Sequence, residues 1–179
     1  MRYIENISYA KNYIGKKTFL TNESLSISET QSEIVINILL KFKGLENKSI
    51  LDVGCGGGGF LKQIKRFNMN KIVGIEPSKT HIQNLQKKPD SKIKIYRGMI
   101  EEFTKEEIGT FDIIVLNGVI KHFNYPVKNL QYCCNLLKKD GIICFNNGLE
   151  EPNLMINLKK RFSIVAQNYF TYKTYQYLF

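Results

Sequence analysis

The chain has 179 residues, of which 43% are hydrophobic, and carries a formal net charge of +10. This size and apolar content suit one domain with a sizeable core and leave little room for a second. No apolar run approaches the roughly 18 residues of a membrane helix, and the N-terminal stretch lacks a signal-peptide core. We therefore expect a cytoplasmic protein without a membrane partner. The four cysteines show no C-x-x-C spacing, which argues against a zinc site and against a disulfide framework.

The positive charge is spread along the chain rather than gathered in one stretch. Several lysine pairs fall late in predicted helices, where cations interact favourably with the helix dipole. Arginine, the better ligand for phosphate and base edges, occurs only at positions 2, 66, 97 and 161. We interpret most of the charge as solvated helix ends. Attraction of an anionic small acceptor and an RNA-binding surface are the two alternatives.

Residues 1–27 contain tyrosines among lysines, and their apolar residues do not recur at helix or strand spacing. This pattern favours either a mobile flap or an arm packed on a sheet edge. Ser28 and Gln31 then have the spacing of a capping box. A helix is predicted over about 29–43, ended by Gly44. Its apolar stripe should pack on the sheet and consists of Ile34, Val35, Ile38, Leu39 and Phe42.

The stretch from Ser49 to Phe60 predicts a strand, a glycine turn and a helix. A short apolar run ends in the acid Asp52, and glycines follow at positions 54, 56, 57, 58 and 59. Glycine permits a sharp reversal and a close approach of backbone to a ligand, and the next helix presents its free N–H groups there. The turn therefore indicates a nucleotide-like ligand, with a turn that binds nothing as the alternative.

Two ligand classes fit this turn, because its glycines also satisfy the dinucleotide pattern G-x-G-x-x-G. The Asp52 carboxylate would repel a pyrophosphate and attract an ammonium group. S-adenosylmethionine carries such a group and no phosphate. The run Asp52-Val-Gly-Cys-Gly-Gly-Gly58 resembles the first motif of the class I S-adenosylmethionine-dependent methyltransferases. That resemblance assigns cofactor contacts to Asp52, Gly54, Cys55, Gly56 and Gly58.

A second apolar strand, residues 71–76, also ends in an acid. Glu76 lies 22 residues beyond Gly54, and an acid at the end of the second strand of a doubly wound sheet can accept both ribose hydroxyls. We expect that role for Glu76, with capping or surface exposure as the alternative. Pro77, which we include in the candidate cofactor site, starts a helix to about residue 88, and residues 93–96 form a third strand.

In the family that the chain resembles, residues matching Met99 and Ile100 flank the adenine. Many members have an aspartate near position 99, and Glu101 is the candidate substitute here. Ordinary core packing is the alternative role for Met99 and Ile100.

Residues 111–145 contain a fourth strand, a turn with His122, a helix through Leu130, a glycine turn at 138–141 and a fifth strand at 142–145. This layout resembles the ubiquinone-biosynthesis type of O-methyltransferase and related small-molecule enzymes, and the resemblance covers about 29–147. It implies that Asn117 and Gly118 contact the cofactor. The Asn-Pro-Pro-Tyr sequence of many amide N-methyltransferases is absent, so oxygen is the preferred acceptor atom.

Two residues of the turn after the fourth strand are candidates for catalysis. His122 could take a proton from the acceptor, because an imidazole suits general-base work at neutral pH; a turn-fixing role is the alternative. Lys121 would favour a negatively charged acceptor. Some relatives hold a divalent metal with acids in this motif, but the matching positions here are Gly118 and Lys121, so no catalytic metal is expected.

The remaining tail, 148–179, has strand-like composition at 163–166 and 170–177, which suggests a short C-terminal hairpin. If the hairpin is shortened, a sheet edge stays open for a second copy of the chain in a homodimer.

These features together predict an α/β protein with a doubly wound, mostly parallel, Rossmann-like sheet. A single domain would comprise an arm (1–27), a cofactor-binding core (28–147) and the tail. The expected reaction is methyl transfer from S-adenosylmethionine, leaving S-adenosylhomocysteine, to a small anionic metabolite. An RNA methyltransferase and a non-catalytic cofactor-binding subunit of a complex are the alternatives.

Overall fold

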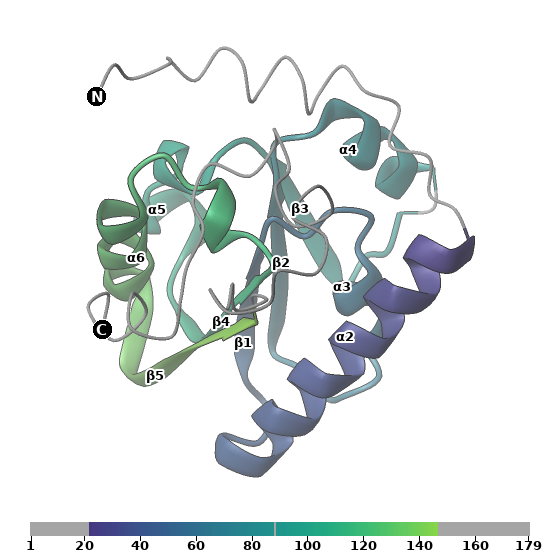
Figure 1. The fold of residues 1–179 in the computed structure, drawn as a ribbon. Helices are drawn as coiled ribbons and strands as arrows, with labels where there is room; N and C mark the ends of the chain where they lie inside the picture. The colour runs from purple at the N-terminus through teal and green to yellow at the C-terminus, as the bar shows by residue number, and fades with distance from the viewer. Residues whose placement is uncertain (1–21, 88, 147–179) are drawn as a thin grey trace, which may run out of the picture.

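A computed structural model describes residues 22–87 and 89–146, with side chains described over 30–87 and 89–145 (Figure 1). Residues 1–21 of the predicted flap or arm (1–27) and the predicted tail strands lie outside these residues. The described elements, in chain order, are α2 (Asn22–Phe42), β1 (Ser49–Val53), α3 (Gly59–Ile64), β2 (Lys71–Glu76), α4 (Lys79–Gln86), β3 (Ile93–Arg97), η1 (Ile100–Glu102), α5 (Lys105–Ile108), β4 (Phe111–Asn117), η2 (Ile120–His122), α6 (Pro126–Asn135) and β5 (Leu137–Asn146).

The described strands form one parallel sheet in the order β3-β2-β1-β4-β5. Ile50 of β1 pairs with Ile72 of β2 on one side and with Ile113 of β4 on the other. The connections therefore run outward in both directions from β1, which confirms the doubly wound fold. The switch point, where such sheets bind ligands, lies between β1 and β4.

Helices cover both faces of the sheet, with α5 and α6 on one side and α2 and α3 on the other (Figure 1). Successive strand residues point to opposite faces. Leu51 and Val53 of β1 accordingly belong to the apolar core beneath α5 and α6, whereas Ile50 belongs to the core beneath α2 and α3. Because both faces are covered, the strands are nearly continuous apolar runs.

Helix α2 differs from its prediction in two ways. It begins at Asn22, so Ser28 lies inside the helix and is not its N-cap, and residues 22–27 belong to the helix rather than to the arm. Its buried face consists of Ser32, Val35, Ile36 and Leu39, and three residues of the predicted stripe are exposed instead. Apolar side chains surround this helix on most sides, so their spacing does not define which side packs. Its predicted end is confirmed: Gly44 has φ +69° and donates its N–H to the Leu39 carbonyl at 3.0 Å.

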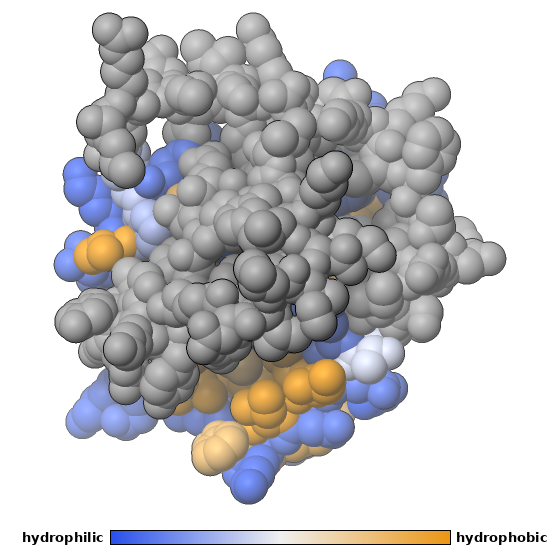
Figure 2. Space-filling view, in the orientation of Figure 1, coloured by the Kyte–Doolittle hydropathy of each residue, from blue (hydrophilic) through white to orange (hydrophobic). Residues whose placement is uncertain are grey.

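The outward side of α2 carries exposed apolar side chains. They are Ile34, Ile38, Leu40 and Phe42, the last 72% exposed. Figure 2 shows apolar surface low in the view, where α2 lies in Figure 1. Within the described residues, none of the helices has the length and apolar content that crossing a bilayer requires.

Local sequence accounts for most other boundaries. Strand β2 has the predicted bounds, and Ser78 caps α4 by accepting the His81 N–H at 3.4 Å. Helix α5 was not predicted, although Thr104 and Glu107 form a full capping box at its start. The residues of the predicted turn, 138–141, belong to β5 instead, where they form an irregularity: Leu137 pairs with Phe111 and the next pair joins Ile142 to Ile113.

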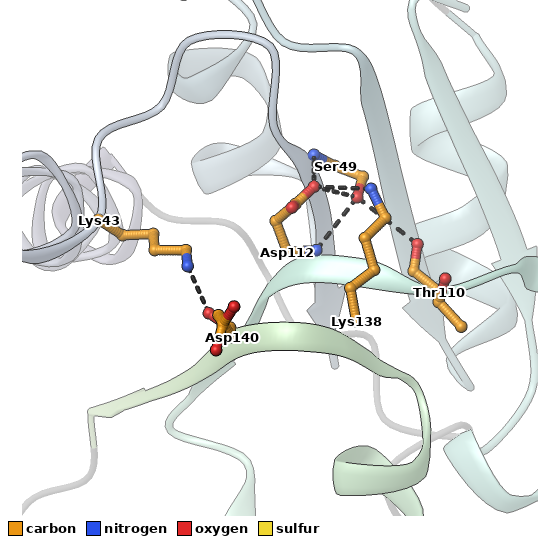
Figure 3. A network of polar contacts seen from close by, with 6 residues as sticks. All are labelled: Lys43, Ser49, Thr110, Asp112, Lys138 and Asp140. Carbon is orange, nitrogen blue, oxygen red and sulfur yellow. Dashed lines mark hydrogen bonds and ion pairs between the residues drawn. The ribbon is translucent and has the colours of Figure 1, made fainter.

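A polar network joins β1, β4 and β5 at the amino end of the sheet (Figure 3). The Asp112 carboxylate accepts the Ser49 N–H at 2.8 Å, the Ser49 hydroxyl at 2.7 Å and the Lys138 ammonium at 2.8 Å. Burial opposes ionisation, yet the hydrogen bonds from Lys138 and Ser49 hold the pKa of Asp112 well below its ordinary value. Lys43 of the segment after α2 also donates to the Asp140 carbonyl, which ties that segment to β5.

Candidate functional site

A pocket lies at the carboxyl ends of β1, β2, β3 and β4, beside the switch point. Its cavity volume is about 120 Å³. Its lining consists of Val53, Gly54, Ile75, Glu76, Pro77, Gly98, Met99, Ile100, Asn117, Gly118, Val119, His122 and Phe123. The pocket thus combines one carboxylate and several polar groups with an apolar wall, at the place where open α/β sheets bind ligands.

The glycine turn after β1 folds back against β2. The N–H groups of Gly54 and Cys55 both donate to the Ile75 carbonyl, at 2.8 and 3.0 Å. Gly54 and Gly58 have φ values of +73° and +75°, and a Cβ on Gly54 would lie 2.7 Å from a methyl group of Val119. Positive φ and this close contact both require glycine. The turn therefore brings backbone, rather than side chains, to the pocket rim.

Glu76 connects this turn to the start of α4. Its Oε2 accepts the Gly56 N–H at 2.8 Å, and its Oε1 accepts the Ser78 N–H at 2.8 Å. The Nδ1 atom of His81 lies 3.5 Å from the same Oε1. Glu76 and His81 are only 2% and 6% exposed. A carboxylate at the end of β2 was predicted, but the buried histidine beside it was not.

Asp52 is buried and does not line the pocket. It is 2% exposed, and strand alternation places it on the α2 and α3 face together with Ile50. Burial, and secondarily the charge of Glu76, raise the pKa of Asp52 from 3.8 to about 8. Without a nearby cation this carboxyl is mostly protonated at neutral pH. An ammonium ligand would have to lower the pKa of Asp52 in order to pair with it.

The structure brings most of the predicted cofactor residues together. Those that line the pocket are Gly54, Glu76, Pro77, Met99, Ile100, Asn117 and Gly118. Those outside its lining are Asp52, Cys55, Gly56 and Gly58. Cys55 is buried, and burial together with the charges of Asp52 and Glu76 raises the pKa of its thiol well above the usual value. The thiol therefore stays protonated.

The two candidate catalytic residues lie on η2. His122 lines the pocket, and its backbone N–H donates to the Val119 carbonyl at 2.8 Å. Lys121 is half-buried next to it but outside the lining. Among residues 22–87 and 89–146, no group of three or more His, Cys, Asp or Glu side chains could hold a metal ion. The absence of a catalytic metal stays a prediction.

Signals for the missed residues do exist in the sequence. A helix starting just after Glu76 places position 81 in its first turn, next to the carboxylate, because a helix needs 3.6 residues per turn. His81 is also one of only two histidines in the chain.

Comparison of the amino-acid sequence with those of known proteins identifies its family. A family model described as a methyltransferase domain matches residues 45–176. A tRNA U34 carboxymethyltransferase of Campylobacter lari is 28% identical over 172 residues, covering 93% of this chain and 59% of that protein. The mitochondrial ubiquinone biosynthesis O-methyltransferase of Bos taurus is 32% identical over 105 residues, which are 55% of this chain and 28% of that protein. The chain thus spans less than two thirds of the length of either relative.

Solved structures show the same fold. The plantazolicin methyltransferase BpumL, crystallised with a pentazolic desmethylPZN analogue and SAH, superposes with a TM-score of 0.65 at 20% identity. The match covers 96% of this chain and 66% of that one.

Proposed function

Since this chain belongs to the methyltransferase domain family, we propose that it binds S-adenosylmethionine in the pocket at the switch point and transfers a methyl group to a small anionic acceptor. The observation that carries the proposal is the position of Glu76, whose carboxylate lies at the end of β2, is fixed by two backbone N–H groups and lines the pocket.

The pocket residues fit the parts of the cofactor. Glu76 would accept hydrogen bonds from the ribose hydroxyls. Met99 and Ile100 would pack against the adenine, and Ile100 already belongs to the apolar core on that face. Gly118, which has φ +73° and no atom within 4 Å of the position of a Cβ, would leave room beside Asn117 for the rest of the ligand.

Bound S-adenosylmethionine supplies an activated methyl group on a sulfonium leaving group. The residues of the chain then have to align the acceptor and exclude water, and positioning of this kind can reach effective molarities on the order of 10⁵ M or more. His122, on the pocket wall, would take the proton of an acceptor hydroxyl. Lys121 beside it would attract a carboxylated or phosphorylated acceptor. Because His122 would deprotonate a hydroxyl group, we propose oxygen as the acceptor atom.

A second candidate acceptor is RNA. The Campylobacter lari relative whose name includes tRNA U34 aligns with 93% of this chain, and the net charge of +10 suits a polyanion. An RNA acceptor predicts binding that weakens steeply as salt concentration rises, because phosphate contacts release counterions. A salt titration of tRNA binding distinguishes the two candidates.

A third candidate function is that of a non-catalytic subunit of a complex. It predicts cofactor binding without methyl transfer to any component of a cell extract.

Calorimetry with S-adenosylhomocysteine and NAD tests the cofactor assignment. We expect S-adenosylhomocysteine to bind and NAD not to bind. Glu76→Ala should weaken binding by roughly 1–3 kcal/mol, the range for polar groups left without partners. Binding of NAD alone would contradict the proposal. A screen of cell extract with labelled cofactor then identifies the acceptor.

A further inference from the structure

His81 lies close to both the glycine turn and the Glu76 carboxylate, outside the pocket lining. It belongs to the first turn of α4, where its N–H donates to the Ser78 hydroxyl at 3.4 Å. Its Nδ1 atom is 3.5 Å from Glu76 Oε1 and 4.0 Å from the position that a Cβ on Gly56 would occupy. At 6% exposure, the imidazole is enclosed by protein rather than by water.

Three nitrogen groups thus approach one carboxylate, and none of the three residues that carry them lines the pocket. The N–H groups of Gly56 and Ser78 each take one oxygen at 2.8 Å, and His81 approaches the oxygen that Ser78 already binds. A movement of about 0.5 Å would bring the His81 nitrogen to ordinary hydrogen-bond distance. A carboxylate has about four acceptor positions on its two oxygens, so positions remain for groups in the pocket.

We propose that His81 is a positioning residue for Glu76: its Nδ1 holds the carboxylate in the orientation that accepts the ribose hydroxyls of the cofactor. The inference rests on the proposed function, because it concerns the same site. Hydrogen bonds that fix a ligand-binding group from behind raise its affinity, since less freedom is lost when the ligand binds. The contribution of His81 is therefore to ligand binding and not only to the packing of α4.

The alternative is that the imidazole only fills space in the core. Two substitutions separate these roles. His81→Asn keeps an N–H donor near the position of Nδ1 while it removes much of the ring volume. His81→Met keeps side-chain volume but removes the donor. Ile82→Val is the matched control, because Ile82 is equally buried in the same helix, at 6% exposure, and its apolar side chain cannot donate a hydrogen bond to Glu76.

The experiment is calorimetric titration with S-adenosylhomocysteine, after thermal unfolding has shown that each variant is folded at the temperature used. His81→Met should weaken binding by about tenfold, the equivalent of one hydrogen bond to a charged group. His81→Asn should recover most of that loss, and Ile82→Val should leave binding within about twofold of the parent protein. If His81→Met binds as the parent does, or if His81→Asn is as weak as His81→Met, the positioning role is refuted.

A second titration tests whether His81 strengthens ligand binding by way of the hydrogen bonds between Glu76 and the ribose hydroxyls. The parent protein and His81→Met are each titrated with S-adenosylhomocysteine and with its 2′,3′-dideoxy analogue. Loss of the two hydroxyls should weaken binding to the parent by a larger factor than binding to His81→Met, because in the variant the carboxylate is already poorly placed. Equal factors in the two proteins would refute the inference. If the parent binds neither compound, the proposed function itself has failed, which is a separate outcome.

Discussion

Replacing Asp52 by asparagine should make the protein more stable in alkaline solution. In the folded chain the pKa of Asp52 is raised from 3.8 to about 8, chiefly by burial and further by Glu76. A raised folded pKa means that the stabilising contribution is fully present below about pH 4 and is lost as pH rises through about 8. Asparagine has no charge to bury. The free energy of unfolding of the variant should therefore rise relative to that of the parent protein as pH increases, and this difference should level off above pH 8.

The size of this effect follows from the pKa shift. Each unit is worth about 1.4 kcal/mol, so titration between about pH 5 and pH 9 should change the difference in unfolding free energy by about 4 kcal/mol. Urea unfolding of both proteins at these two pH values measures it. Asp90→Asn is the control and removes a surface carboxylate that pairs with Lys65. Its free energy of unfolding relative to that of the parent protein should not rise between these two pH values. A stability difference between parent and Asp52→Asn that is independent of pH would refute the reasoning.

Three further substitutions test other parts of the structure. His122→Ala should lower turnover roughly 10²–10⁴-fold if the imidazole is the base, with S-adenosylhomocysteine affinity nearly unchanged in calorimetry; full activity would remove it from the mechanism. Chelators should have no effect on turnover, and activity restored by magnesium would show that a metal is needed. Asp112→Ala should cost roughly 1–3 kcal/mol in urea unfolding at neutral pH. Because the folded pKa of Asp112 is lowered, its contribution is present above about pH 4 and lost below, so this penalty should shrink in acid. Gly58→Ala should destabilise by about 1–2 kcal/mol, since φ is +75° and the new Cβ would meet Leu85 at 2.5 Å; an unchanged melting temperature would contradict this.

The strands and the pocket could be predicted because their signals are local. A buried parallel strand is an apolar run, and the acids and glycines that end β1 and β2 follow such runs directly. The doubly wound order then brings the ends of these strands together without further information. Glu76, Asn117 and His122 were found in this way, and all three line the pocket.

The misassigned features depend on contacts between distant segments. Apolar residues between Ile34 and Leu40 lie on most sides of α2, so only the sheet and α3 determine that Ile36 is buried and Ile38 exposed. The high pKa of Asp52 requires the enclosure of its carboxyl and the charge of a residue on another strand. The place of His81 next to Glu76 follows from the helix that starts after β2, but its burial close to Gly56 depends on how α4 packs against the glycine turn.

The Asp112 network also bears on how the strands find their alignment during folding. Ile50 and Leu51 of β1, like Ile113 and Ile114 of β4, are buried aliphatic residues, so a slip of one position would still pair apolar side chains on both faces. The same slip would carry Asp112 about 3.3 Å along the strand and break its bonds to Ser49, leaving a poorly solvated charge without its donors. Misaligned pairing is therefore opposed by the Asp112 network, whereas the aliphatic interior of the sheet discriminates little between the two alignments. Chains without this carboxylate should collapse as readily but sort their central strands into the native alignment more slowly.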